Sequence, residues 1–457
     1  MDKLEASDSD YEDFSNAEDY SQYKLDGYHP VYISEKFKNG KYQIIQKLGW
    51  GHFSTVWLIK DTTEDNLYFA LKIQKSKANY FEAAKDELEL LNELKKKENL
   101  DQWNKEIEEY NLTLGIKRYL KKDQDFVIKL VDNFVHIGIH GKHPCSILEL
   151  MGPNLLDVIQ YHETNKKAMN IKLIKHITKQ ILFGLDYMHR ICKIIHTDLK
   201  PENIMIKLPT DKIDDFLSQL KTYRKKPLSM KFLKYLKTQL GKKPKITSIN
   251  EINKADDDLN KIMNNLSLEK KDGFIEGVLI WKESIMIPLD ENLQIKIVDF
   301  GNGCWVNRHF TNNIQTREYR SFEAVIGLDY QANTDIWSLA CIVFEMMTNT
   351  FLFKPKQTEL YDKNDDHLAL MIETLGPVPH HLLSQGMYSS KYFDKDGTLK
   401  RIKNIKEYKI GTILINEFKY DPKTAKETEE FLVQMLEYDP NKRKDAKELL
   451  KSSWLWD

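Results

Sequence analysis

The segment from Ile195 to Ile204, which reads I-H-T-D-L-K-P-E-N-I, constrains this chain more than any other. It places an aspartate at position 198, a lysine two residues later and an asparagine five residues later. A carboxylate, an ammonium group and an amide oxygen can accept a proton, face an anion and hold a metal ion, respectively. A loop with an aspartate that caps a helix could contain the same letters, so the rest of the chain has to decide between the two interpretations.

A glycine-containing turn lies between two predicted strands near the N-terminus. Residues 42–48 alternate between polar and apolar side chains, which predicts a strand, and they continue into the pattern G-x-G-x-x-S-x-V at residues 49–56. The two glycines allow a tight hairpin to bring backbone N–H groups over the phosphates of a nucleotide. Ser54 stands where a third glycine is usual, so this pattern is weak evidence when taken alone. The residues of the motif are Leu48, Gly49, Trp50, Gly51, His52, Phe53, Ser54 and Val56.

A lysine interrupts the next apolar run, Phe69-Ala70-Leu71-Lys72-Ile73. A lysine on the inner face of a strand needs partners for its charge, and nucleotide phosphates together with a helix carboxylate would supply them. The helix predicted over residues 79–97 follows directly. Glu87 is the first candidate for this carboxylate and Glu89 the second, whereas a solvated helix face is the alternative for Glu87.

The next motif with polar functional residues begins near position 293, about ninety residues after the loop at 195–204. A strand predicted over residues 293–298 ends in Asp299-Phe300-Gly301, which delivers the carboxylate of Asp299 to a metal ion. Asp335 begins an apolar helix that we expect to be buried. Arg443 is the expected partner of Glu323, because an unpaired buried carboxylate is costly.

In this order, the motifs resemble those of eukaryotic protein kinases. The resemblance implies an α+β, bilobal fold with a small β-rich N-lobe and a large helical C-lobe, split by an insert. It implies that Asp198 accepts or orients the proton of a seryl hydroxyl and that Lys200 stabilises the transferring phosphoryl group. It also implies that Asn203 and Asp299 bind Mg²⁺, and that Lys72, paired with a helix carboxylate, holds the α- and β-phosphates of ATP. The adenine pocket is expected at Ala70, Leu148, Glu149, Met151 and Met205.

Within the kinases, the chain is similar to the serine/arginine-rich-protein kinases, which phosphorylate splicing factors. The resemblance covers about residues 27–207 and 283–457, and a long insert between the catalytic loop and D-F-G is also typical of that family. It implies ATP and Mg²⁺ as cofactors and Arg-Ser repeats as substrates. The segments that carry it are G-Y-H-P-V from Gly27, L-G-W-G-H-F-S-T-V-W from Leu48, H-T-D-L-K-P-E-N from His196, and Q-T-R-E-Y-R-S from Gln315.

Two departures from the usual kinase pattern have physical consequences. Thr197 replaces the arginine that anchors a phosphorylated activation loop, so we expect the unphosphorylated protein to be active, as the family is regarded to be. Asp366 and Glu373 match acidic docking positions of the family, seven residues apart on one helix face. Thr350 and Lys354 stand where the family carries acidic residues, and Asp365 with Asp366 could instead cap a helix predicted over 367–375.

These observations predict a domain plan. Residues 1–26 form a disordered acidic tail, 27–151 the N-lobe, 152–207 the first part of the C-lobe, 208–282 a flexible insert, and 283–457 the rest of the C-lobe. Residues 221–245 contain ten basic side chains and no acidic one. Such a stretch could bind nucleic acid, a membrane surface or an acidic partner, or could be a solvated insert. For the kinase we expect no direct contact with nucleic acid and no membrane.

The rest of the sequence favours a cytoplasmic and nuclear monomer. The four cysteines, at positions 145, 192, 304 and 341, show no metal or disulfide spacing, so we expect reduced, mostly buried thiols. The acidic N-terminus is no signal peptide, and the apolar run 337–347 is too short to span a membrane. Three alternatives stay open: a dual-specificity kinase of splicing factors, a pseudokinase scaffold, and a ribonucleoprotein-binding protein acting through the insert.

Overall fold

The computed structural model describes residues 19–64, 67–97, 101–113, 125–208 and 292–456, together with Ile213 and Leu289. Most of the predicted acidic tail and nearly all of the predicted insert lie outside the described residues. The chain divides into two compact units. The first contains the described residues of Met1–Lys85, Leu130–Leu150 and Leu208–Met286, and the second those of Asp86–Lys129, Met151–Lys207 and Ile287–Asp457.

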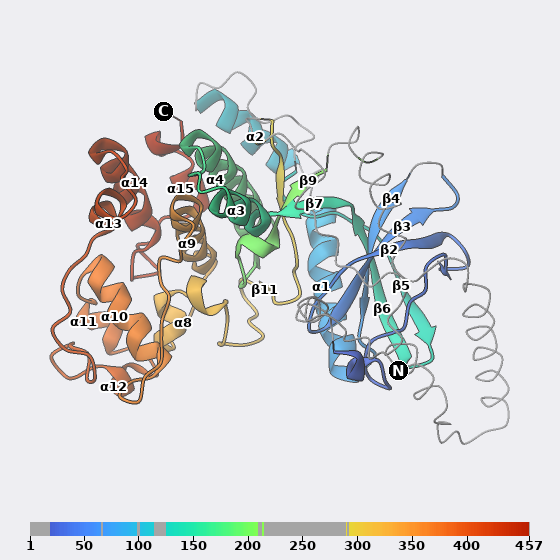
Figure 1. Ribbon diagram of the computed structural model, residues 1–457, viewed down its shortest axis with the longest axis horizontal. Helices are drawn as coiled ribbons and strands as arrows, with labels where there is room; N and C mark the ends of the chain where they lie inside the picture. Colours follow the sequence, from blue (N-terminus) through green and yellow to red (C-terminus); the bar gives the residue numbers. More distant parts are fainter. Residues whose placement is uncertain are drawn as a thin grey trace, which may run out of the picture. The chain divides into compact units, whose positions relative to one another are not determined.

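The first unit contains a six-stranded antiparallel sheet with the order β1-β2-β3-β4-β6-β5 (Figure 1). Its elements are the 3₁₀ helix η3 (Tyr20–Gln22), β1 (Lys36–Phe37), β2 (Tyr42–Trp50), β3 (Ser54–Asp61), β4 (Tyr68–Gln74), β5 (Leu130–Gly138) and β6 (Gly141–Glu149). The polar–apolar alternation of β2 buries every second residue at its start, as the sequence predicts. The core beneath the sheet consists of Phe37, Tyr42, Ile44, Trp57, Ile59, Leu71, Ile73, Cys145 and Ile147.

The two outermost strands of this sheet, β1 and β5, meet through their side chains. The ring centroids of Phe37 and Phe134 are 6.4 Å apart, and Nζ of Lys38 donates a hydrogen bond of 2.6 Å to Oδ1 of Asp132. The hydroxyl of Tyr42 donates to Oδ2 of the same aspartate at 2.8 Å. The sheet is therefore curled until its first and last strands approach each other, as a strongly twisted sheet allows.

The second unit is mostly helical. The helix α1 (Ala78–Lys97) begins in the first unit and continues into the second. The other helices are α2 (Asp101–Thr113), α3 (Leu155–Thr164), α4 (Ile171–Asp186), α8 (Phe322–Ile326), α9 (Thr334–Thr348), α10 (Lys363–Leu375), α11 (His380–Leu383), α12 (Ser389–Tyr392), α13 (Ile410–Asn416), α14 (Pro422–Met435) and α15 (Ala446–Leu449). A π-helical turn, η4 (Tyr187–Cys192), extends α4, and η5 (Pro201–Asn203), η9 (Arg317–Tyr319) and η10 (Ser453–Leu455) are 3₁₀ turns.

Two small sheets accompany these helices. One has the order β10-β9-β7 and the other pairs β11 with β8. Their strands are β7 (Met151–Asn154), β8 (Ile194–Ile195), β9 (Ile204–Lys207), β10 (Ile295–Ile297) and β11 (Cys304–Trp305). The helices α4 and α9 lie side by side (Figure 1), and every residue of α9 is buried, as predicted for the helix that begins near Asp335.

The segment between α1 and β5 contains the separate helix α2, whose mostly polar sequence hides its helical pattern. Strand β5 begins only at Leu130, because residues 126–128 bond instead to β10, with Ile297 N donating to Phe126 O at 2.8 Å. All four cysteines are buried and free, as predicted. No helix in the described part of the chain is long and apolar enough to cross a membrane.

Candidate active site

The loop that carries Asp198 is attached to the start of α9. The buried carboxylate of Asp335 accepts hydrogen bonds from the backbone nitrogens of His196, at 2.8 Å, and Thr197, at 2.9 Å. Nε2 of His189 lies 2.8 Å from the same carboxylate. Because a buried carboxylate needs several donors, these bonds fix the backbone of the loop at the point where it enters the site.

The ring of His196 connects this loop to the strand that precedes Asp299. The ring is fully buried, its Nε2 lies 2.9 Å from the carbonyl oxygen of Val298, and its Nδ1 accepts a 3.2 Å bond from the backbone nitrogen of Asp198. These partners assign the ring proton to Nε2, which donates to Val298. A single side chain therefore sets the distance between the two aspartates of the site.

The carboxylate of Asp198 lies in a network with Lys200 and Thr316. Its Oδ1 accepts hydrogen bonds from the backbone nitrogen of Thr316, at 3.1 Å, and from the hydroxyl of Thr316, at 2.8 Å. Nζ of Lys200 is 3.2 Å from Oδ2 of Asp198 and donates to the hydroxyl oxygen of Thr316 at 3.2 Å. The side chain of Asn302 donates a longer bond of 3.3 Å to Oδ2. An acceptor and a cation are thus held side by side before any substrate binds.

Two predicted metal ligands, Asn203 and Asp299, lie beside the neighbouring ends of the paired strands β9 and β10. Position 203 directly precedes β9 and position 299 follows β10, and these strands pair with Ile204 opposite Ile297. The amide nitrogen of Asn203 donates to the carbonyl oxygen of Asp198 at 2.9 Å, so its carbonyl oxygen is the atom that can bind a metal. Asp299 adopts a positive φ of 64°, a conformation that aspartate tolerates. An amide oxygen and a carboxylate suit a hard divalent cation.

In the first unit, three neighbouring strands bring the predicted phosphate-binding residues together. Gly49 of β2 lies opposite Val56 of β3, and Val56 lies opposite Lys72 of β4. The hydroxyl of Tyr28 donates a 2.6 Å bond to the carbonyl oxygen of Gly51, which fixes the turn. A Cβ atom added at Gly49 or Gly51 would meet no protein atom within 4 Å. Packing within the chain therefore requires neither glycine, which fits a turn that approaches a ligand.

The predicted adenine-binding residues lie in two groups. In the first unit, Ala70 of β4 lies opposite Leu148 of β6, and Glu149 ends β6 one residue later. In the second unit, Met151 and Met205 lie on the paired strands β7 and β9. In both units, the predicted adenine-binding residues therefore lie on β-strands.

The predicted partners Lys72 and Glu87 belong to different units. Lys72 lies on β4 in the first unit, and Glu87 lies in the part of α1 that belongs to the second unit, where its side chain is only 3% exposed. The alternative prediction, that Glu87 lies on a solvated helix face, is therefore wrong, because its side chain is buried. Its pairing with Lys72 stays a prediction.

The predicted docking residues lie on one helix, α10, but their surroundings differ from the expectation. Asp366 and Glu373 are both half-buried, and Oδ2 of Asp366 accepts a 2.7 Å bond from the backbone nitrogen of Lys356. The N-cap predicted at Asp365 and Asp366 is wrong, because α10 begins four residues earlier and Asp362 is its N-cap, but both aspartates do place negative charge in the first turn of the helix. Asp365 completes a capping box with Asp362 and forms a 2.6 Å ion pair with Arg401.

A buried glutamine, Gln315, has a role that the sequence analysis did not assign. Its backbone nitrogen donates to the carbonyl oxygen of Thr197 at 2.8 Å. Its side-chain nitrogen donates to Thr334 O and Ser338 Oγ, both at 2.9 Å, and its side-chain oxygen accepts from Ser321 N at 2.9 Å. Its backbone has a positive φ of 66°. No local pattern reveals such a residue, because its partners come from distant parts of the sequence.

Comparisons with known proteins agree with this arrangement. A family model described as "protein kinase domain" matches residues 42–233 and 280–455. The chain is 38% identical over 428 residues to serine/threonine-protein kinase SRPK of Physarum polycephalum, covering 92% of this chain and 87% of that protein. It is 32% identical over 494 residues to protein kinase dsk1 of Schizosaccharomyces pombe, with 96% and 84% covered. It is 30% identical over 539 residues to human SRSF protein kinase 3, with 97% and 91% covered.

The match confirms the predicted fold class. The two matched segments are separated by residues 234–279, which lie inside the predicted insert. The described residues before and after this interruption form a β-rich sheet and a mostly helical unit.

Proposed function

The chain belongs to the SRPK family of serine/threonine protein kinases, and we propose that it transfers the γ-phosphate of ATP to serines in arginine- and serine-rich segments of splicing-factor-like proteins. Protein kinases of this fold use ATP and a divalent metal ion. The observation that carries the proposal is the network of Asp198, Lys200 and Thr316, which holds an acceptor and a cation side by side. Related proteins are named SRPK or SRSF protein kinases.

The reaction uses each group of this network for one task. Asp198 accepts or orients the proton of the attacking seryl hydroxyl, and Lys200 stabilises the charge on the transferring phosphoryl group. Both act where they are already held, so little reorganisation is needed during the reaction. Magnesium, when bound by Asn203 and Asp299, neutralises charge on the phosphates.

The nucleotide is held by the predicted phosphate-binding residues and by the predicted adenine-binding residues. The turn at Gly49 and Gly51 covers the phosphates and excludes water, and Lys72, paired with Glu87, binds the α- and β-phosphates. The adenine ring lies against Ala70, Leu148 and Met205, and the backbone at Glu149–Met151 forms its hydrogen bonds. The glycines support this assignment, since nothing within the protein occupies the space beside them.

We further propose that the kinase needs no activating phosphate. Both ends of the segment between Asn302 and Gln315 are bonded to Thr197: its hydroxyl donates to Asn302 O at 2.6 Å, and its carbonyl oxygen accepts from Gln315 N at 2.8 Å. These uncharged hydrogen bonds anchor the segment, as the ion pair between an arginine and a phosphate does in other kinases. Phosphate on Thr316 would place negative charge beside Asp198 and repel it.

Arginine recognition is assigned to α10. Seven residues span about 10 Å along a helix, so Asp366 and Glu373 can contact two different arginines of one extended peptide. Carboxylates bind guanidinium groups in a bidentate manner, which lysine cannot reproduce. We expect the protein to act as a monomer in the cytoplasm and nucleus, and imaging of the tagged chain in cells tests this location.

Radiolabel transfer from ATP·Mg to an Arg-Ser repeat peptide tests the proposal. Phosphatase-treated protein should match untreated protein in rate. Asp198→Asn should lower turnover by about a hundredfold or more, the range for a general base, while binding of a fluorescent ATP analogue persists. Asp329→Asn, which changes an exposed carboxylate, is the control and should keep full activity. A requirement for phosphate on Thr311, Thr316 or Tyr319, or loss of ATP binding in Asp198→Asn, would contradict the assignment.

A further inference from the structure

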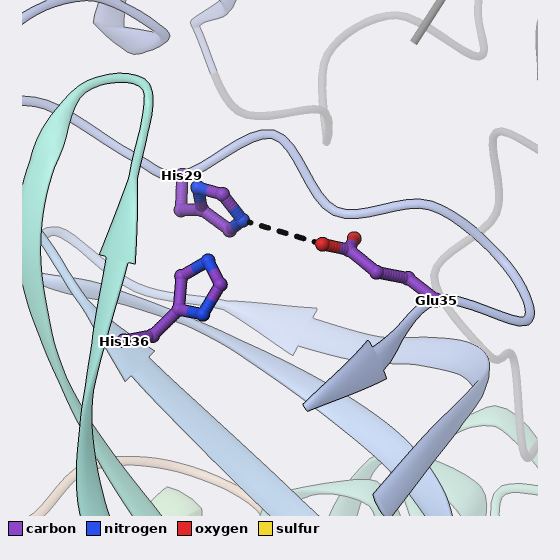
Figure 2. Close-up of side chains that lie close together, drawn as sticks. All are labelled: His29, Glu35 and His136. Carbon is purple, nitrogen blue, oxygen red and sulfur yellow. Dashed lines mark ion pairs between the residues drawn. The ribbon is translucent and has the colours of Figure 1, made fainter. Parts of the chain in front are cut away.

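Three potential metal ligands of the first unit converge at one point, and none of them belongs to the residues assigned to phosphate transfer or nucleotide binding. His29 lies in the segment before β1, Glu35 directly precedes β1, and His136 lies on β5 (Figure 2). One ligand atom from each lies within 4.8 Å of the other two. Figure 2 shows Nε2 of His29 directed at the carboxylate of Glu35, 3.7 Å away, with the ring of His136 below that of His29. Two imidazoles and one carboxylate are a typical ligand set for zinc.

The imidazole of His29 has no hydrogen-bond partner. The residue is 5% exposed, and neither ring nitrogen is bonded to any described residue. An imidazole always carries at least one N–H, and 3.7 Å to Glu35 is too long for a hydrogen bond. A buried polar ring without partners is rare and calls for an ion or a water. The protein therefore keeps a costly arrangement that a bound cation would relieve.

Neighbouring groups pack against His29 and orient Glu35. The ring of His143 lies 5.1 Å from that of His29, and its Nδ1 is fixed by the carbonyl oxygen of Gln74 at 2.8 Å. Oε2 of Glu35 accepts a 2.9 Å bond from the backbone nitrogen of Tyr32, so that the other carboxylate oxygen, Oε1, faces His29. Outer contacts of this kind orient metal ligands in known sites.

A glycine at position 138 makes room for the central ring. A Cβ atom added at Gly138 would lie 2.3 Å from Nδ1 of His29. Any other residue there would displace the ring. The observed position of His29 therefore requires a glycine at the end of β5, the strand that also supplies His136.

The distances suit a small divalent cation after a slight adjustment. Zinc binds nitrogen and oxygen ligands at about 2.0–2.2 Å, so two ligands of a tetrahedral site lie about 3.4 Å apart, close to the 3.7 Å between His29 and Glu35. The ligand atoms of His136 need to move by at most about 1–1.5 Å to reach this spacing from the 4.8 Å limit.

We propose that His29, Glu35 and His136 form a zinc-binding site that joins the two edges of the six-stranded sheet. His29 and Glu35 flank the start of β1, and His136 belongs to β5, the strand at the other end of the sheet order. The ring of Phe37 on β1 already lies 4.5 Å from that of His136. A cation bound here links two segments that are a hundred residues apart and secures the curled shape of the sheet. Water completes the coordination, and the site is structural.

Zinc titration of the full chain tests this proposal. The protein is freed of metal with EDTA, exchanged into chelator-free buffer without nucleotide, and titrated with Zn²⁺ against a fluorescent chelator. We expect one equivalent bound with a sub-micromolar Kd and a higher thermal midpoint. His136→Gln and Glu35→Gln should each weaken binding by about a hundredfold or more, since each removes a ligand. His140→Gln is the control, because His140 lies in the same hairpin but bonds to Tyr28 O at 2.6 Å; it should stay within about threefold of the wild type.

Substitution with Co²⁺ gives a second readout that does not depend on stability. Bound Co²⁺ should show visible absorption bands of a four- or five-coordinate nitrogen–oxygen site, and Glu35→Gln should remove them. Circular dichroism establishes that each variant is folded, and Glu35→Gln decides alone if His136→Gln does not fold. Binding of less than about a tenth of an equivalent to the wild type, or equal binding by both ligand variants and the control, would overturn the proposal.

Discussion

Replacing Arg443 with methionine should destabilise the second unit by about 3–5 kcal/mol. The side chains of Arg443 and Glu323 are both completely buried. They form two parallel hydrogen bonds, from NH1 to Oε1 at 2.7 Å and from NH2 to Oε2 at 2.8 Å. Nε of the arginine also donates to Glu437 O at 2.9 Å, and its guanidinium lies 5.1 Å from the ring of Trp337. The pairing was predicted from the sequence and is confirmed.

The magnitude follows from the carboxylate that the substitution leaves behind. Arg443→Met deprives Glu323 of its counter-ion where no water reaches it, and breaking a buried pair on one side costs about 3–5 kcal/mol. Replacing both residues with methionine removes the stranded charge. The double variant should therefore be more stable than Arg443→Met by about 2 kcal/mol or more, although it has lost more polar contacts.

Urea unfolding followed by tryptophan fluorescence measures these differences, because Trp337 lies beside the pair. With slopes of about 1–3 kcal/mol per molar urea, the midpoint of Arg443→Met should fall by more than about 1 M. Lys423→Met is the control: it breaks an exposed pair with Glu427, 3.7 Å apart, and should change stability by less than about 0.5 kcal/mol. A loss below about 1 kcal/mol in Arg443→Met, or a double variant no more stable than the single one, would refute the reasoning.

Two further predictions concern acidic residues of the second unit. Burial raises the pKa of Glu345 to about 7 from 4.5, so its contribution to stability is fully present below pH 4.5 and is lost as pH rises through 7. The loss should approach about 3 kcal/mol; Glu345→Gln should flatten this part of the pH–stability curve in urea titrations, and an unchanged curve would exclude Glu345 as its source. Replacing Asp366 and Glu373 with Asn and Gln should raise the KM for an Arg-Ser peptide by about tenfold or more and leave the KM for ATP unchanged. The exposed variant Asp396→Asn should behave like the wild type, and an unchanged peptide KM in the double variant would remove α10 from substrate binding.

Local pattern and charge were enough to predict the elements that carry the chemistry. The strand that bears Lys72 and the loop that bears Asp198 follow from short motifs whose spacing is set by one reaction. The pair of Glu323 and Arg443 was predictable because a buried charge requires a partner. Such features depend on residues that are neighbours in sequence or on a strict requirement for compensation.

The features that sequence analysis missed depend on distant partners or on ambiguous composition. Gln315 bonds to residues up to 118 positions away, at Thr197, and His29 meets His136 only because the sheet curls. The helix α2 has polar or charged side chains at nine of its 13 positions, so its apolar stripe is narrow. At the start of α10, acidic residues at 362, 365 and 366 were all suitable caps, and only the tertiary structure selects Asp362.

Phosphate transfer to two matched peptides, one of Arg-Ser repeats and one of Lys-Ser repeats, tests the central claim most directly. Both peptides carry the same charge and the same serines, so only guanidinium recognition distinguishes them. With Asp198→Asn as the blank, we expect strong preference for the Arg-Ser peptide. Equal use of both peptides would leave a protein kinase without the proposed arginine selectivity, and transfer to neither would contradict the account of the active site.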